Sequence, residues 1–192
     1  MTRAAARPRN AQATRQAILD QARRLFAQNG YAATTVKAVA EATAVSPNLI
    51  TRYFGGKEGL FLASTQTELH LDPVFSGPRE SLGAQLAAGI VHRWSGMDGE
   101  DPLLVLQRAA GERPEAAEAL AHFLDVQSLQ PLVRCLRDYG FSEAEAWSRA
   151  SAIDALVLGV STRRRVLRTD LGDPDALRTW FATTIQRLVD AP

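Results

Sequence analysis

The stretch from Thr34 to Lys57 reads TTVKAVAEATAVSPNLITRYFGGK and predicts two short helices joined by a tight corner. The second helix has the better defined start, because Ser46 suits the N-cap and Pro47 suits the first helical position, where no internal hydrogen bond is lost. Val45 and Ile50 then stand at the positions of a hydrophobic staple. This pairing predicts which face of the second helix is buried.

The other face of this helix carries polar side chains. At about 100° per residue, Asn48, Thr51 and Arg52 lie opposite the apolar Ile50 and Phe54. Asn can pair with the N6/N7 edge of adenine, Arg with the O6/N7 edge of guanine, and Thr with either base or a thymine methyl. The pattern fits a helix that enters the major groove of DNA. It also fits an ordinary solvated face.

A family resemblance favours the first interpretation. The chain from about residue 12 to 62 resembles the N-terminal signature of the tetracycline-repressor (TetR) family of transcription regulators, through Ala40-Glu41-Ala42, Val45-Ser46, Arg52-Tyr53-Phe54, Lys57-Glu58 and Leu60-Phe61. The resemblance implies that the helix beginning at Ser46 reads bases. It also implies that Thr35, Tyr53 and Lys57 contact phosphates, which set the register of the protein on the duplex.

Three positions depart from the family pattern. Ala44 stands where the corner commonly has Gly, Asn48 where a small residue is frequent, and Thr51 where Tyr is common. Because Asn48 and Thr51 lie on the predicted reading face, the DNA sequence bound by a relative cannot be transferred to this protein.

Charge is unevenly distributed along the 192 residues, although the net charge is only +1. Residues 1–60 contain nine Lys and Arg against three acidic residues, and the remainder contains thirteen against eighteen. A basic segment releases counterions when it neutralises phosphates, which supplies the part of DNA affinity that does not depend on sequence. The asymmetry therefore favours a basic DNA-binding head and an acidic body, and scattered solvated charge is the alternative.

Other classes of protein receive little support from the sequence. There is no membrane-length apolar run and no secretory signal, and the single Cys135 excludes an internal disulfide, so we expect a cytoplasmic protein. The three histidines show no metal-ligand spacing, and nucleophile elbows and phosphate loops are absent, so we expect no metal, no cofactor and no enzyme. A helical small-molecule-binding protein or an all-α enzyme without a DNA role remains the alternative.

The sequence predicts an all-α fold, because no alternating strand pattern occurs. We expect a disordered basic arm over residues 1–12, a three-helix helix-turn-helix domain over 13–58 and a larger helical regulatory and dimerisation domain over 59–192. The first helix should run from about Thr14 to Asn29-Gly30. A fourth expected helix begins at Gly59 and continues through LFLASTQTELHL into the body.

Prolines and capping residues predict where the helices of the body begin and end. Pro131 should kink or break a helix spanning 114–139 near Leu129, because proline lacks the N–H that the helix needs. Ser142 and Glu145 form a capping box. The expected helices are 79–95, 101–110, 114–139, 142 to about 167, and one that begins at Asp173-Pro174.

The last two helices carry apolar stripes that predict a homodimer. A four-helix bundle of two helices from each subunit would bury these stripes, as the resemblance implies. The alternative is that both stripes face only their own core. The predicted interface residues are Ala150, Ile153, Val157, Val160, Leu177, Phe181, Ile185 and Leu188.

A small-molecule effector is implied by the resemblance, and its pocket should lie among residues 79–139. Apolar walls with a few polar groups are typical of such pockets, and ordinary core packing is the alternative for each residue. The candidate residues are His92, Trp94, Met97, Phe123 and Gln127. The prediction is a repressor that a small molecule releases from a palindromic operator.

Overall fold

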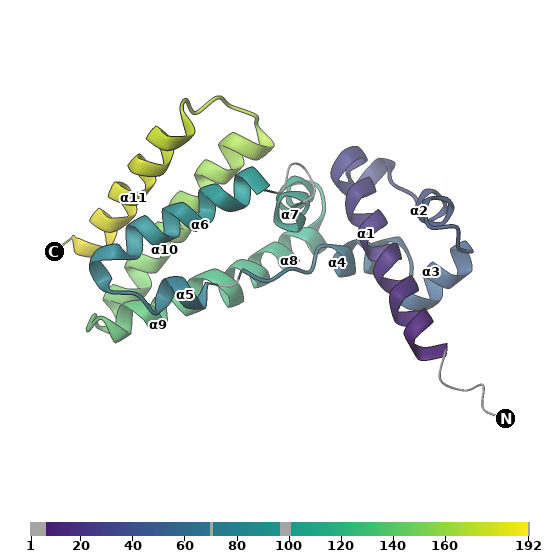
Figure 1. The fold of residues 1–192 in the computed structure, drawn as a ribbon, viewed down its shortest axis with the longest axis horizontal. Helices are drawn as coiled ribbons and strands as arrows, with labels where there is room; N and C mark the ends of the chain where they lie inside the picture. The colour runs from purple at the N-terminus through teal and green to yellow at the C-terminus, as the bar shows by residue number, and fades with distance from the viewer. Residues whose placement is uncertain (1–6, 70, 97–100, 192) are drawn as a thin grey trace. The chain divides into compact units, whose positions relative to one another are not determined.

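The chain is α-helical in a computed structural model that describes residues 7–69, 71–96 and 101–191 (Figure 1). No strand occurs within these ranges, which confirms the predicted all-α class. The chain divides into two compact units. The N-terminal unit comprises residues 1–67 and 99–119, and the C-terminal unit comprises residues 68–98 and 120–192.

Five helices build the N-terminal unit: α1 (Arg7–Ala33), α2 (Val36–Ala42), α3 (Pro47–Phe54), α4 (Lys57–Ser64) and α7 (Pro102–Ala110). Gly30 interrupts α1 with a positive φ of 77°, where Asn29-Gly30 predicted a stop. Beyond this break, the buried Thr34 hydroxyl donates to the carbonyl of Gly30 at 2.8 Å and to that of Leu25 at 3.1 Å. Thr34 therefore satisfies the end of α1 and fixes where α2 can begin.

The first helix begins earlier than predicted. Residues 7–12, which we expected to be part of a disordered arm, belong to α1. Most of these residues are good helix formers, and α1 extends from a packed segment that begins at Ile18. Residues 1–6 lie outside the described residues.

Aromatic side chains form the centre of the N-terminal unit. The Phe26 and Phe61 rings meet edge to face at 5.1 Å, and Tyr31 lies 5.1 Å from Phe61 and 5.9 Å from Phe26. Helix α7 packs on α1, where Arg108 donates to the carbonyl of Ala27 at 3.4 Å. The unit thus extends beyond the expected boundary at residue 58 and includes a helix that lies far along the chain.

Helix α4 is shorter than predicted. It ends at Ser64, whereas the sequence suggested a helix continuing through residue 71. The Ser64 and Thr65 hydroxyls donate to the carbonyl of Phe61 at 2.8 and 3.2 Å. Such side-chain bonds compete with the helical ladder, so the Ser-Thr pair provides a local reason for the end.

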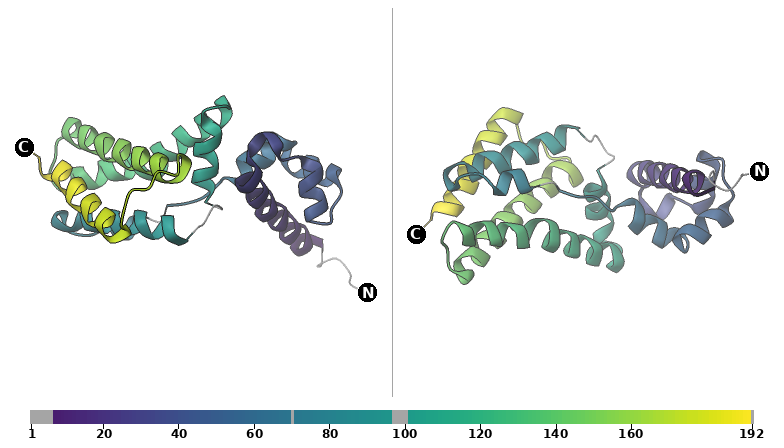
Figure 2. Two further views of the ribbon diagram at one scale, coloured as in Figure 1. Left: turned by 90° about the horizontal axis from the view of Figure 1, so that it is seen from above. Right: turned by 60° about the horizontal axis from the view of Figure 1, so that its bottom comes forward.

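The C-terminal unit is built mainly from long helices. Figure 2 shows α6, α10 and α11 side by side. Its elements are α5 (Asp72–Phe75), η1 (Arg79–Ser81), α6 (Leu82–Gly96), α8 (Pro114–Leu124), the π-helical turn η2 (Asp125–Leu129), α9 (Gln130–Asp138), α10 (Glu143–Ser161), the π-helical turn η3 (Thr162–Val166) and α11 (Pro174–Asp190). The division between the two units falls within α8.

Several predicted helix boundaries are confirmed. The capping box forms, because Ser142 accepts from the backbone of Glu145 and the Glu145 carboxylate accepts from the backbone of Ser142. Asp173 caps α11 by accepting from Ala176 at 2.8 Å. Pro131 is the second residue of α9 and lies two residues after the end of η2, as expected for a proline that removes an α-helical hydrogen bond and widens the preceding turn.

Helices α6 and α11 approach closely at Gly83. A Cβ atom at this position would lie 2.4 Å from the Ala182 carbonyl oxygen and 2.8 Å from the Gln186 nitrogen. Along the same interface, Trp94 packs edge to face on Phe181, with ring centroids 5.6 Å apart. Glycine is therefore required for the contact that buries the α11 core residues.

The apolar stripes of α10 and α11 belong to the core of their own unit. Of the predicted interface residues, Ala150, Ile153, Leu177, Phe181 and Ile185 are buried there. Val157, Val160 and Leu188 are only partly buried and pack against the same core. The prediction that the whole stripes form a subunit interface is therefore corrected. The five buried side chains pack in the core of their own chain, as the alternative interpretation expected.

Candidate nucleic-acid interface

The corner between α2 and α3 has a defined geometry despite lacking glycine. Ala44 adopts a left-handed φ of 53°. The Val45 N–H donates to the carbonyl of Ala40 at 3.0 Å, and the Ala44 N–H donates to that of Glu41 at 3.2 Å. These two bonds form a Schellman motif, which usually has glycine at the left-handed position. The corner therefore keeps its shape at the cost of strain in Ala44.

Helix α3 presents the predicted two faces. The Ile50 side chain is 0% exposed and that of Phe54 is 9% exposed, so both anchor the helix in the core. Asn48, Thr51 and Arg52 are exposed. The buried pair fixes the rotation of the helix, and the three polar side chains consequently project outward.

The helix N-termini differ from one another. Thr35 caps α2, since its hydroxyl accepts from the Ala38 N–H at 3.0 Å. Ser46 occupies the N-cap position of α3 with an extended backbone, but its hydroxyl makes no capping hydrogen bond. This corrects the capping role expected for Ser46, and the exposed hydroxyl is available to donate to a phosphate oxygen. Pro47 takes the first helical position as predicted.

Two arginines lie against aromatic side chains of α3. The Arg52 guanidinium lies 5.5 Å from the ring centroid of Tyr53. Arg15 of α1 lies 5.1 Å from the Phe54 ring, which brings a further positive charge to α3. The sequence analysis missed Arg15, because α1 spacing alone does not show which of its exposed faces adjoins α3.

Lys57 is held by its own unit. Its ammonium donates to the carbonyl of Ala32 at 3.1 Å and lies 4.4 Å from the ring centroid of Tyr31. Arg113 also lies 4.4 Å from that centroid. Partial burial and the positive charge of Arg113 lower the pKa of Lys57. The lysine is thus oriented at the start of α4, and its remaining N–H groups can meet an outside anion.

The residues predicted to bind a ligand are not gathered into one site. Trp94 is buried against Phe181 and His92 is exposed. Phe123 and Gln127 are partly buried, and the Gln127 amide oxygen accepts from the Leu69 N–H at 3.4 Å. Met97 lies outside the described residues.

A partly buried polar pair in the C-terminal unit was not predicted. Ser128 of η2 donates to Asp154 of α10 at 2.9 Å. Burial raises the pKa of the Asp154 carboxyl, and the hydrogen bond from Ser128 opposes that shift. This hydrogen bond links η2 to α10. The sequence contains no sign of the pair, because Pro131 predicts an irregular turn but not the residue that the turn contacts.

Two family descriptions match the chain. The family described as "Bacterial regulatory proteins, tetR family" matches residues 18–64, and that described as "Tetracyclin repressor-like, C-terminal domain" matches residues 80–189. The two matches cover the helix-turn-helix region and most of the C-terminal unit. The chain belongs to the tetR family of bacterial regulatory proteins.

Individual relatives agree with this class. A segment of 50 residues is 52% identical to the HTH-type transcriptional repressor AcnR of Corynebacterium glutamicum, and it spans 26% of this chain and 27% of that protein. NalD, the secondary repressor of the MexAB-OprM multidrug efflux pump in Pseudomonas aeruginosa, has the same fold, with a TM-score of 0.71 and 23% identity over 92% of this chain and 96% of its own. The fatty acid degradation regulator FadR of Bacillus halodurans matches with a TM-score of 0.70 and 20% identity over 93% and 95% of the two chains.

The described ranges contain neither a membrane-length apolar helix nor a cluster of metal-ligating side chains. No helix in the described ranges is long and apolar enough to cross a bilayer. No group of three or more His, Cys, Asp or Glu side chains suited to a metal ion lies within the same ranges.

Proposed function

We propose that this protein is a transcriptional repressor that binds a palindromic operator through α3 and is released by a small-molecule effector. One observation carries the proposal: Asn48, Thr51 and Arg52 are exposed on α3, while Ile50 and Phe54 anchor the opposite face. Amide and guanidinium groups on a short, rigidly anchored helix suit the base edges of the major groove.

Each proposed DNA contact has a role. Asn48 and Arg52 read purine edges, and Thr51 contacts a neighbouring base. Backbone phosphates are bound by Thr35, Ser46, Tyr53 and Lys57, while Pro47 allows the start of α3 to approach the duplex. The phosphate contacts position the helix and the base contacts select the sequence.

The operator contact requires two copies of the chain. A two-fold dimer would present two α3 helices at a spacing of about 34–36 Å or a multiple of it, which matches successive major-groove faces of a palindrome. The outward sides of α10 and α11 supply the interface, since Trp147 is 46% exposed and Ala152 and Ala155 are also exposed. Val157, Val160 and Leu188 contribute the surface that their own core leaves uncovered.

The effector acts by shifting populations. A ligand that binds better to the dimer conformation unable to reach both half-sites lowers the fraction competent for DNA. This proposal assigns no catalytic role and places the protein in the cytoplasm, where its operator would be. A helical binding protein without a DNA role is the alternative, and it would bind no duplex above background.

The test begins with selection of bound duplexes from a random pool, followed by binding titrations on the enriched sequence. We expect an inverted repeat. Arg52→Ala should cost about 1–3 kcal/mol and relax the preference at one base position, because one side chain reads one base pair. Lys57→Ala should weaken binding to all operator variants equally, because a phosphate contact carries no sequence information.

A matched control separates charge from position. Arg137→Ala removes the same charge from an exposed site on α9, outside the proposed dimer interface, and should leave both affinity and base preference nearly unchanged. If Arg52→Ala and Arg137→Ala weaken binding equally across all operator variants, α3 is not the reading helix. Absence of any enriched sequence would overturn the proposal as a whole.

A further inference from the structure

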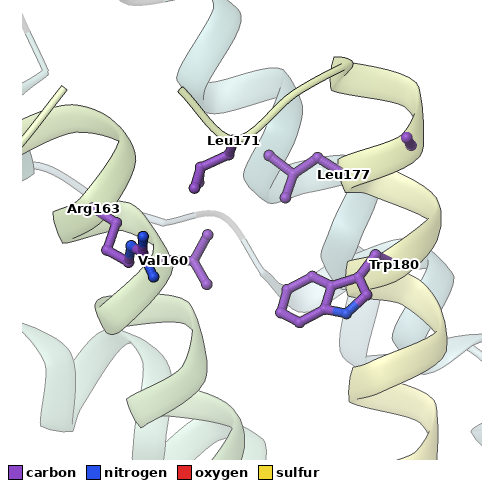
Figure 3. Close-up of a pocket in the computed structure, with 6 residues that line it drawn as sticks. Val160, Arg163, Leu171, Leu177 and Trp180 are labelled. Carbon is purple, nitrogen blue, oxygen red and sulfur yellow. The ribbon is translucent and has the colours of Figure 1, made fainter. Parts of the chain in front are cut away.

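The hollow shown in Figure 3 belongs to the proposed subunit interface. Val160 and Arg163 face Leu177 and Trp180 across it, and its volume is about 380 Å³. Because Val160 is among the residues that the proposed dimer covers, a partner subunit would close this hollow. The N-terminal unit contains two neighbouring cations, and the proposed function assigns a role to only one of them.

These two cations share the ring of Tyr31. The Lys57 ammonium and the Arg113 guanidinium each lie 4.4 Å from its centroid. Contacts with the Phe26 and Phe61 rings hold the Tyr31 ring in place. An aromatic ring attracts a cation through its quadrupole, but two cations on one ring also repel each other. Lys57 is therefore held less firmly than the ring alone would hold it.

The backbone of Arg113 fixes where its charge lies. Its N–H donates to the carbonyl of Ala109, in the last turn of α7, at 2.9 Å. Its carbonyl accepts from the N–H groups of Ala116 and Ala117, in the first turn of α8, at 3.1 and 3.0 Å. The guanidinium also pairs with the Glu115 carboxylate at 3.3 Å. Arg113 is thus attached to both helices at the turn that joins them.

The internal partners of Lys57 compete with a phosphate for the same charge. Besides the ring contact, the ammonium donates to the carbonyl of Ala32 at 3.1 Å. Partial burial and the charge of Arg113 lower the pKa of Lys57, which reflects the cost of a second positive charge in this cluster. Repulsion from Arg113 therefore lowers the free energy needed to transfer Lys57 from its internal contacts to a phosphate.

We propose that Arg113 is a positioning residue for the phosphate contact of Lys57. Its like charge weakens the hold of Tyr31 and Ala32 on the ammonium, which leaves the ammonium available to the DNA backbone. In this role Arg113 acts through Lys57 and makes no contact of its own with the duplex. The inference rests on the proposed function, which assigns Lys57 to a backbone phosphate.

The first test is a double-mutant cycle on the enriched operator, measured with full-length protein. Arg113→Gln should weaken binding roughly threefold per half-site, as expected for two side chains in one network. In Lys57→Ala the same substitution should change affinity by less than about 1.5-fold, because the ammonium on which Arg113 acts is absent. Arg113→Lys keeps the charge and should bind like wild type. Arg137→Gln, which removes an exposed arginine of α9, should change affinity in neither background.

The second test needs no DNA. The chain has only two lysines, Lys37 and Lys57, so Lys37→Arg assigns both side-chain resonances in protein labelled with ¹³C-lysine. Arg113→Gln should raise the pKa of Lys57 in an NMR titration, because removal of a neighbouring positive charge favours the protonated ammonium. Lys37 serves as the internal reference, and circular dichroism checks that each variant is folded.

The two proposals fail in different ways. If Lys57→Ala leaves operator affinity unchanged, the phosphate contact is wrong and the role of Arg113 falls with it. If Arg113→Gln weakens binding by the same factor with and without Lys57, Arg113 acts through its own contact or through net charge, and only the positioning role is overturned. Unchanged operator affinity, or an unchanged pKa of Lys57, in folded Arg113→Gln would also overturn that role.

Discussion

Arginines in the two units have different surroundings. In the N-terminal unit, Arg52 projects from α3, and its nearest ring is that of its neighbour Tyr53. In the C-terminal unit, Arg149 donates to the carbonyls of Leu188 at 3.0 Å and Val189 at 3.3 Å, and it stacks 4.4 Å from the Phe141 ring. One arginine faces outward, whereas the other holds the end of a helix.

The difference extends beyond a single pair of residues. Arg79 repeats the pattern of Arg149, since its guanidinium stacks 4.6 Å from the centroid of the same Phe141 ring and donates to the Asp190 carboxylate at 3.0 Å. Guanidinium groups near a helix C-terminus satisfy its free carbonyls and complement its dipole. The C-terminal unit thus uses these cations to stabilise itself, while the N-terminal unit keeps the cation of α3 available to a partner.

Phe181→Ala should produce the largest effect, because Phe181 is fully buried and packs against both Trp94 and Trp180. Truncating a buried phenylalanine typically costs about 3–5 kcal/mol. All three tryptophans lie in the C-terminal unit, so urea denaturation followed by tryptophan emission reports on this unit alone. Thr183→Ala, an exposed change on the same helix, should stay within about 0.5 kcal/mol. A loss below 1 kcal/mol for Phe181→Ala would mean that α11 does not carry the core.

Arg149→Ala should have a smaller effect on stability, of about 2 kcal/mol, because hydrogen bonds to charged groups contribute roughly 1.5–3 kcal/mol. Arg52→Ala should change stability by less than about 0.5 kcal/mol, since its side chain is exposed. The same denaturation assay measures the first variant, and thermal unfolding by circular dichroism measures the second. Equal destabilisation by the two substitutions would remove the distinction between a structural and an outward-facing arginine.

The sequence predicted local features well. Three predicted features depend on residues within one turn of each other, so short-range chemistry determines them: the cap at Asp173, the capping box at Ser142 and the irregular turn before Pro131. The polar face of α3 was also correctly placed outward, because the spacing of Ile50 and Phe54 fixes its rotation. These features need no knowledge of distant contacts.

Long-range packing was predicted less well. An apolar stripe such as that of Phe181 and Ile185 indicates burial but not which chain covers it, and here the cover comes from the same unit. The packing of α7 on α1 depends on contacts between segments distant in sequence. Periodicity contains no information about such partners.

Ala44→Gly should change stability less than Phe181→Ala and Arg149→Ala do, and it should be stabilising. The left-handed φ of 53° at Ala44 costs about 1–2 kcal/mol of strain, which glycine would not have. The greater conformational freedom of glycine in the unfolded chain offsets part of this gain in stability. We expect a net gain of about 0.5–1 kcal/mol, measured by circular dichroism because the N-terminal unit contains no tryptophan. Ala42→Gly, two residues earlier on the exposed side of α2, should instead lose about 0.5–1 kcal/mol through its lower helix propensity. A loss in both variants would show that the corner does not hold Ala44 in the left-handed region, and the outward orientation of α3 would then need another cause.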